Sequence, residues 1–270
     1  SKYPRLTDLE RKAQRRIPPF VFAYLDAGTG RDLAKSVNET VYRDLALTPQ
    51  FLRGRVKADT STTLLGKTYN APFGVAPVGL SSTIWPGAEQ VLARSAKRHG
   101  FPYTLSTVAG DSIERVSAVG GDMFWFQIYP PASREICRDL RRRAEACGVE
   151  TLVVTADVPA PSRRERMRLS GGPSGSRGKG LYSPRVLMQS ATRPQWALRM
   201  LANGGPRFRT MEPYFDRSGG QSITEFIGGQ LNGGLDWDYL DVIRDHWKGK
   251  LLLKGILHGQ DAERAVRQGC

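Results

Sequence analysis

The chain has 270 residues, 40% of them hydrophobic, so it can bury a core large enough for a single α/β barrel domain. Its net charge of +14 would attract phosphates, nucleic acid or an anionic membrane, but the basic residues do not form the single stripe interleaved with aromatic residues that is typical of a nucleic-acid groove. We interpret the basic clusters at 11–16 and 138–143 as solvated helix faces.

Cysteine content and hydropathy indicate the compartment. Three cysteines are too few and too irregularly spaced for a disulfide framework or a zinc site, which favours a reducing environment and predicts no metal. No run of about 18 apolar residues occurs, and the first five residues lack a hydrophobic signal core. We therefore expect a cytoplasmic protein without a spanning helix.

The amino-terminal part is predicted to be helical. From Leu6 to Leu25 apolar residues recur at helical spacing, and Pro18-Pro19 divides this stretch into two helices. The range 32–42 indicates another short helix. The range 45–70 predicts irregular strands and turns that close one end of a barrel.

From Ala71 onward the pattern alternates between apolar strands and amphipathic helices. The predicted strands are 73–77, 103–107, 124–129, 151–157 and 251–255, and the predicted helices are about 86–98, 112–118, 133–146, 236–246 and 261–268. Connections this short demand a parallel sheet.

Polar side chains stand at the carboxyl ends of these strands, where α/β folds place their binding sites. They are Ser106, Gln127, Tyr129, Thr155, Asp157 and Lys254, beside the unhindered backbone of Ala76, Pro77, Val78 and Gly79. A flat aromatic cofactor needs backbone amides, neutral hydrogen-bonding side chains, and a cation where charge develops on reduction. This set of residues supplies all three.

The range 159–234 interrupts the alternation. It is rich in Gly, Pro, Ser and Arg, is far longer than an ordinary connection, and contains one convincing helical run, Gln195 to Leu201. We expect this segment to be a functional lid or to be partly disordered.

Several motifs resemble, in order and spacing, the FMN-dependent 2-hydroxy-acid oxidases and dehydrogenases. They are Tyr24, Ala76-Pro77, Leu105-Ser106-Thr107, Phe126-Gln127-Ile128-Tyr129, Thr155-Ala156-Asp157, Arg163-Arg164-Glu165-Arg166 and Leu253-Lys254-Gly255. The ranges 84–86, 122–127 and 194–196 resemble the mandelate and L-lactate dehydrogenase branch in particular. The resemblance implies an α/β TIM barrel with FMN at its carboxyl face, of which this chain holds the first five βα units. Without the resemblance, the five predicted strands alone would indicate an open five-stranded sheet.

The resemblance also implies roles for these residues. The 76–79 backbone, Ser106, Gln127, Thr155 and Lys254 would contact FMN, with Lys254 stabilising the negative charge of the reduced flavin. In the substrate site, Tyr24 would hold the substrate carboxylate, Tyr129 would contact its hydroxyl, and Arg164 would line the entrance. The pattern alone would make Tyr24 a core aromatic residue.

The family's catalytic base is not found in these 270 residues. In the family the counterpart of Asp157 orients a histidine that removes a proton from the substrate. That histidine lies in a Ser-Asn-His-Gly-Gly-Arg segment after the sixth strand, together with an arginine that binds the substrate carboxylate. We interpret His258 as a loop histidine without such a role, and His99 and His246 as helix residues at the wrong end.

The expected activity is oxidation of a small L-2-hydroxy acid, of the mandelate, lactate or glycolate type, to the 2-keto acid. We expect these 270 residues alone to be catalytically silent. The alternatives that stay open are a flavin-binding remnant and a basic binding module. The expected partners are an electron acceptor, either oxygen, a quinone or another oxidant, and further copies of the chain in a homo-oligomer.

The range 159–234 has two interpretations. In the mandelate and lactate branch the matching segment can attach the enzyme to a membrane, and for this chain we would expect the inner face of the membrane. The alternative is that the segment is a mobile lid with a solvated basic surface. The residues that would suit an anionic lipid surface are Arg177, Lys179, Arg185, Arg193, Arg199, Arg207 and Arg209 with Leu181, Tyr182, Trp196, Leu198 and Leu201.

Overall fold

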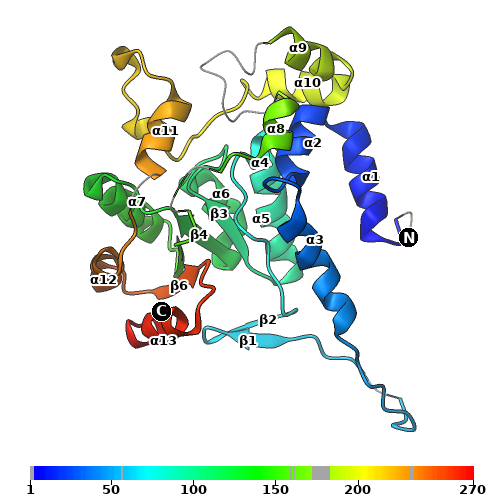
Figure 1. Ribbon diagram of the computed structural model, residues 1–270. Coiled ribbons are helices and arrows are strands. Elements are labelled where there is room, and N and C mark those ends of the chain that lie inside the picture. The colour runs from blue at the N-terminus through cyan, green and yellow to red at the C-terminus, as the bar shows by residue number, and fades with distance from the viewer. Residues whose placement is uncertain (1–2, 56, 159, 161, 172–182, 232–233) are drawn as a thin grey trace. The chain divides into compact units, whose positions relative to one another are not determined.

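A computed structural model describes the chain apart from residues 1–2, 56, 159, 161, 172–182 and 232–233 (Figure 1). The chain divides into two compact units. Residues 1–59 and 162–202 form the smaller unit, and residues 60–161 and 203–270 form the larger unit.

The larger unit is built on a parallel sheet. Strands β3 (Tyr103–Ser106), β4 (Phe124–Ile128), β5 (Thr151–Thr155) and β6 (Lys250–Lys254) pair in chain order. The helices that follow the strands are α5 (Ala88–His99), α6 (Ile113–Gly120), α7 (Arg134–Ala146), α12 (Trp237–His246) and α13 (Gly259–Arg267). Because each crossover between neighbouring parallel strands has the same hand, these helices cover one face of the sheet. The predicted βα alternation is confirmed.

The first predicted strand is shorter than expected. In the range 73–77 only Val75 pairs, in a parallel bridge with Tyr103. The Val75 N–H donates to the Pro102 carbonyl (2.8 Å), and the Thr104 N–H donates to the Val75 carbonyl (3.0 Å). Pro77 has no N–H to extend the pairing. The first of the five βα units therefore has a single bridging residue in place of a strand.

The side chains of the strands alternate between two faces. On the helix-covered face the buried apolar residues are Leu105, Phe126, Ile128, Leu152, Val154 and Leu251. The opposite, inner face carries Thr104, Ser106, Trp125, Gln127, Val153, Thr155, Leu252 and Lys254. The apolar members of the inner face lie in the amino-terminal and middle parts of the strands, and most of its polar members lie at the carboxyl ends.

A hairpin covers part of the inner face. Strands β1 (Thr62–Leu64) and β2 (Lys67–Tyr69) pair antiparallel. The Tyr69 ring meets the Trp125 ring edge-on, with 6.2 Å between centroids, and both pack with Val153. The part of the inner face nearer the amino ends of the strands is therefore buried under the predicted lead-in segment.

Short polar residues begin several of these helices. The side chain of Ser112 accepts from Arg115 N–H, that of Ser133 from Ile136 N–H, and that of Asp236 from Tyr239 N–H. Such N-caps satisfy N–H groups that have no partner within the helix. The remaining elements of the larger unit are α4 (Ser81–Ile84), η2 (Gly121–Met123), η4 (Glu212–Tyr214), η5 (Arg217–Gly219) and α11 (Ile223–Leu231).

The smaller unit is helical. Its elements are α1 (Leu6–Arg16), α2 (Pro19–Asp26), α3 (Leu33–Thr40), η1 (Val41–Asp44), α8 (Glu165–Leu169), α9 (Pro184–Ala191) and α10 (Pro194–Ala202). The Phe20 ring packs edge-on against Trp196, with 5.9 Å between centroids, and the Phe20 N–H donates to Gln189 Oε1 (2.8 Å). These contacts join α2 to the two helices of the 184–202 region.

The expectation of one helical run within 159–234 is wrong. The run at 195–201 is α10, but α8, α9 and α11 are helices as well. Helix α9 has Ser183 as its N-cap and Pro184 at its first position, and Val186 on its buried side. This is a standard helix start. In the sequence, the surrounding Gly, Ser and Arg residues obscured the Ser183-Pro184 helix start.

Charged residues join the end of α2 to α3 and α8. The Asp26 carboxylate accepts from Lys35 Nζ (2.5 Å) and from Arg166 Nη1 (2.6 Å), and Arg166 also pairs with Asp32 (2.7 Å). Burial alone would raise the pKa of Asp26, but the hydrogen bonds from Lys35 and Arg166 outweigh it and hold the pKa below its ordinary value of 3.8.

We expect Asp26→Asn to lower the thermal unfolding midpoint at pH 7 by about 2–8 °C, because partly exposed charge-assisted hydrogen bonds contribute about 1 kcal/mol. A carboxylate with a lowered folded-state pKa stabilises above its unfolded pKa and loses that contribution as pH falls through the folded value. The difference in unfolding midpoint between wild type and Asp26→Asn should therefore shrink below pH 3.8. Thermal melts followed by circular dichroism, between pH 7 and a pH below 3.8, measure this difference. Glu39→Gln is the control, since that carboxylate is exposed and 4.0 Å from Lys35, and an equal effect of both changes would contradict the prediction.

Candidate functional site

The register of the sheet gathers the predicted polar side chains on the inner face. Ser106 stands opposite Gln127, and Thr155 stands opposite Lys254. Gln127 Nε2 is 2.7 Å from Thr155 Oγ1, which joins β4 to β5 through side chains. Ser106, Gln127 and Thr155 are all buried. Four residues predicted from strand ends are therefore neighbours in one polar row, defined by Ser106, Gln127, Thr155 and Lys254.

Gln127 carries an unsatisfied group. Its Oε1 is buried and has no hydrogen-bond partner in the described part of the chain. A buried acceptor without a partner costs about 1–3 kcal/mol. A ligand that brings an N–H donor to this oxygen would remove that cost. The row thus offers an open acceptor, hydroxyl groups and, from Lys254, a cation.

Thr107 extends the ladder beyond β3 and places Tyr129. Its N–H and Oγ1 both donate to the Gln127 carbonyl, at 3.0 and 2.7 Å, and the Tyr129 N–H donates to Thr107 Oγ1 (3.1 Å). Burial, followed by the negative charge of Asp157, raises the pKa of Tyr129. The phenol is therefore neutral at pH 7 and can donate a hydrogen bond. Thr107 was recognised only as part of a motif, without this positioning role.

Asp157 and Lys254 form an ion pair at the ends of β5 and β6. Lys254 Nζ lies 3.0 and 3.1 Å from the two carboxylate oxygens, and each side chain is about 40% exposed. Gly255 follows with φ +97°, and a Cβ there would lie 2.4 Å from Asp157 Cβ. Only glycine permits both that backbone and that approach. Sequence reasoning missed this requirement, although the Lys-Gly dipeptide signals it.

The 76–79 backbone leads into a segment anchored by a buried carboxylate. Glu89 is fully buried and accepts from the N–H groups of Ser82 and Gly110, both at 2.9 Å, and from the Ser82 hydroxyl. The Leu80 N–H also donates to the Val108 carbonyl (2.9 Å). These bonds fix the segment after residue 79 against the loop that follows β3. Glu89 was not predicted, because its partners Ser82 and Gly110 come from two separate loops, 7 and 21 positions away.

Tyr24 and Arg164 lie together in the smaller unit. The Arg164 guanidinium donates to the carbonyls of Ala27 (2.8 Å) and Tyr24 (2.5 Å) and lies 5.2 Å from the centre of the Tyr24 ring. Arg164 holds a left-handed backbone with φ 40°. The sequence-predicted residues thus form two groups, one in each unit: Tyr24 with Arg164, and the polar row with Tyr129 and Asp157.

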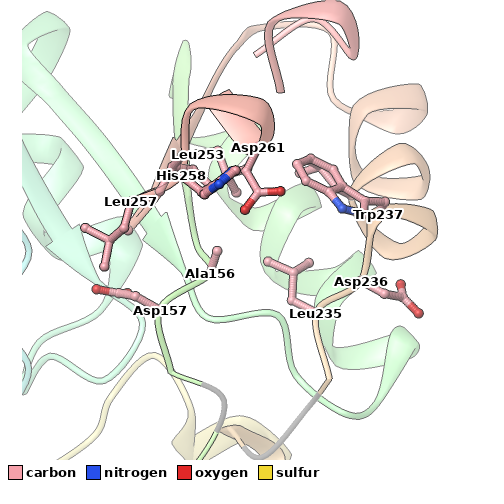
Figure 2. Close-up of a pocket in the computed structure, with 12 residues that line it drawn as sticks. Ala156, Asp157, Leu235, Asp236, Trp237, Leu253, Leu257, His258 and Asp261 are labelled. Carbon is pink, nitrogen blue, oxygen red and sulfur yellow. The ribbon is translucent and has the colours of Figure 1, made fainter. Parts of the chain in front are cut away.

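A pocket of about 480 Å³ lies at the carboxyl ends of β5 and β6 (Figure 2). Its lining includes Asp157 and the loop after β6, and the close-up shows His258 and Asp261 on one side and Asp157 and Leu235 opposite. Leu253 and Leu240 also line it, and both belong to the helix-covered core. The pocket therefore opens on the helix side of β6.

The structure places the three histidines at helix ends. His258 is the N-cap of α13, within the pocket, and His99 and His246 are the last residues of α5 and α12. The described residues contain no cluster of three His, Cys, Asp or Glu side chains suited to a metal ion.

The polar row fits the isoalloxazine ring of FMN. The ring carries an N–H donor and carbonyl acceptors along one edge, which match the open Gln127 oxygen and the hydroxyls of Ser106 and Thr155. The reduced ring carries negative charge, which a lysine cation stabilises. Ala76 and Val78 are exposed, so the 76–79 backbone is accessible to a ligand.

Comparisons with known proteins agree with this fit. The family model described as FMN-dependent dehydrogenase matches residues 13–270. The L-lactate dehydrogenase of Pectobacterium atrosepticum is 36% identical over 269 residues, covering 97% of this chain and 67% of that protein. That of Caulobacter vibrioides is also 36% identical, with 97% and 68% covered. This chain thus spans about two thirds of the length of these relatives.

Solved structures match the fold. The monotopic membrane protein (S)-mandelate dehydrogenase superposes with a TM-score of 0.90 at 28% identity, covering 100% of this chain and 71% of that one. A mandelate oxidase with benzoyl-formic acid gives a TM-score of 0.77 at 28% identity, covering 99% and 66%. The prediction of an FMN-type TIM barrel represented by its first five βα units is confirmed. The chain belongs to the FMN-dependent dehydrogenase family.

Proposed function

We propose that the protein oxidises a small L-2-hydroxy acid to the corresponding 2-keto acid. The observation that carries this proposal is the polar row, in which the open Gln127 oxygen lies between hydroxyl groups and the Lys254 cation at one edge of the sheet. L-lactate dehydrogenases and (S)-mandelate dehydrogenase are the named relatives, and both names specify a small 2-hydroxy acid.

We assign the cofactor contacts to the 76–79 backbone, Ser106, Gln127, Thr155 and Lys254. FMN, when bound, accepts the hydride equivalent from the substrate carbon. Lys254 stabilises the negative charge that follows reduction. Its exposed ion pair with Asp157 contributes only about 0–1 kcal/mol, so Lys254 can turn toward a flavin at little cost.

We assign the substrate contacts to Tyr129, Tyr24 and Arg164. The raised pKa of Tyr129 keeps its hydroxyl protonated, so it can donate to the oxygen of the substrate. Tyr24 holds the substrate carboxylate, and Arg164 lines the entrance. In the described structure Arg164 also fixes the carbonyl of Tyr24, which gives it a positioning role for that residue. The electron acceptor, a homo-oligomeric state and the absence of nucleic-acid binding stay predictions.

The substrate test uses two proteins. One is this 270-residue chain, and the other joins it to the carboxyl-terminal part of an L-lactate dehydrogenase relative, which supplies the family's histidine and arginine. We expect the 270-residue chain to retain FMN weakly and the joined protein to retain it firmly. With added FMN, we expect only the joined protein to bleach it anaerobically with L-lactate or (S)-mandelate, because general-base catalysis contributes about 10²–10⁴-fold. His258→Gln should not change the result. If the 270-residue chain alone bleached the flavin and His258→Gln abolished that bleaching, His258 would be the base. The assignment of the base to the family's carboxyl-terminal histidine would then be wrong.

In the joined protein, Lys254→Met should make the flavin reduction potential more negative and slow reduction by substrate about 10²-fold, because a charge-stabilising group is lost. Lys250→Met is the matched control, since Lys250 begins the same strand and lies 3.8 Å from Glu150. Redox titration and stopped-flow absorbance measure the two effects. A potential and a rate that stay at wild-type values in Lys254→Met would remove Lys254 from the site.

We further propose that α9 and α10 contact an anionic membrane surface. Leu187, Met188, Leu198 and Leu201 are exposed on these helices, and Arg185 and Arg199 are exposed among them. Apolar side chains among arginines suit the interface of an anionic bilayer. No helix in the described ranges has the length and apolar content to cross a bilayer, and the similar (S)-mandelate dehydrogenase is a monotopic membrane protein.

Some residues expected on this surface do not belong to it. Trp196 is buried against Phe20. Arg207 pairs with Glu212, and Arg209 lies 4.0 Å from Asp111, both in the larger unit. Arg177, Lys179, Leu181 and Tyr182 lie outside the described residues. The proposed surface is therefore restricted to α9 and α10.

We expect the double substitution Leu198→Glu and Leu201→Glu to weaken binding to vesicles of anionic lipid at least about tenfold, because two leucines no longer enter the apolar interface. Vesicle co-sedimentation measures this. Val37→Glu is the control, as Val37 is similarly exposed on α3 of the same unit. Equal binding by the double variant and wild type would leave the solvated-lid interpretation.

A further inference from the structure

A basic pocket lies in the helix layer of the larger unit, between α7 and α12. Its volume is about 270 Å³. It is lined by Arg134, Cys137, Arg138, Arg141, Tyr239, Val242, Ile243 and His246. The lining contains three arginines and no carboxylate. Because α7 and α12 cover the sheet on the side opposite the polar row, this pocket is separate from the flavin site.

Arg141 is the unusual residue of the pocket. Its side chain belongs to the buried class, at 6% exposed, and its Nε has no hydrogen-bond partner in the described part of the chain. The Arg141 side chain also interacts with Cys137, but a thiol does not balance its charge, and buried charges in proteins are normally paired with an opposite charge. The interpretation of 138–143 as a solvated face is wrong for this residue.

Two other arginines of α7 form ion pairs with carboxylates. Arg142 pairs with Asp139 (3.0 Å), and Arg143 pairs with Glu114 (2.8 Å). By contrast, Arg134, Arg138 and Arg141 make no ion pair with any described carboxylate. The unpaired arginines are the ones that line the pocket. The positive charge is therefore concentrated where there is space for a ligand.

The pocket is also shaped by fixed groups. The Arg134 guanidinium lies 3.3 Å from the centre of the Tyr239 ring, and the Tyr239 hydroxyl donates to the Pro131 carbonyl (2.8 Å). Stacking holds the planar guanidinium in place, so less freedom is lost when it binds a ligand. Val242 and Ile243 supply an apolar wall.

We propose that this pocket binds the phosphate group of a small phosphomonoester. A phosphate dianion offers several oxygens to the forked N–H groups of arginine and balances more of the charge than a carboxylate does. Arg141 donates to it from the buried side, and Arg134 and Arg138 donate from the rim. The apolar wall accommodates the organic part of the ester.

The test is a calorimetric titration of the FMN-loaded protein, so that the flavin phosphate site is already filled. Inorganic phosphate and phenyl phosphate are the probes, at an ionic strength matched with chloride. We expect saturable binding of one equivalent, with phenyl phosphate tighter than phosphate. Arg141→Met should weaken both at least about tenfold, because charge-assisted hydrogen bonds from the buried side are lost. Arg142→Met, which removes a paired and exposed arginine of the same helix, should bind both probes as wild type does.

A second variant guards against a folding defect in Arg141→Met. Arg138 is exposed, so Arg138→Gln should keep the wild-type circular dichroism spectrum and still weaken phosphate binding. Wild-type affinity in both Arg141→Met and Arg138→Gln would overturn the proposal, and so would a wild-type protein that binds neither probe at millimolar concentration. Chloride that displaces phosphate at the matched ionic strength would also overturn it, because the pocket would then bind any anion.

Discussion

The parallel register of β3 to β6 is the constraint on which the site depends. It places Ser106 opposite Gln127 and Thr155 opposite Lys254. A slip of one residue in any strand would exchange its two faces. Gln127 would then enter the apolar core and Phe126 would enter the site, so burial of an unpaired amide would oppose the slip. The apolar helix-facing residues thus fix the polar row without contacting it.

Strand ends were predictable from sequence because both signals are local. An apolar run marks a buried strand, and the polar residue at its end marks the edge of the sheet, as at Thr155 and Lys254. The missed features depend on partners far along the chain. Glu89 meets Gly110, and Gly255 is required by Asp157, 98 positions earlier. The bridge at Val75 likewise depends on where Tyr103 lies, and periodicity carries no such information.

Two buried groups without partners lie on opposite sides of the same sheet. Gln127 Oε1 faces the inner side, and Arg141 Nε lies in the helix layer. Other buried polar groups of the larger unit differ among themselves, since Glu89 is satisfied by Ser82 and Gly110 whereas Gln268 Oε1 has no partner in the described residues. An unsatisfied buried group costs stability, and at these two positions, which adjoin the polar row and the pocket between α7 and α12, we propose that a ligand removes that cost. An acceptor calls for a donor such as a flavin N–H, whereas a guanidinium calls for an anion.

The net charge of +14 therefore has several physical roles, which composition alone could not separate. Arg166 holds Asp26 and Asp32, Arg143 joins α7 to Glu114, and Lys254 stands at the strand ends. These cations have partners or an assigned charge to stabilise. What distinguishes Arg141 is burial without a carboxylate, on a helix whose next two arginines are paired. Helical spacing puts 134, 138 and 141 on one face, with 142 at its edge and 143 on the opposite side. The sequence already contained that spacing, but only the position of α12 shows that Arg141 on this face is buried.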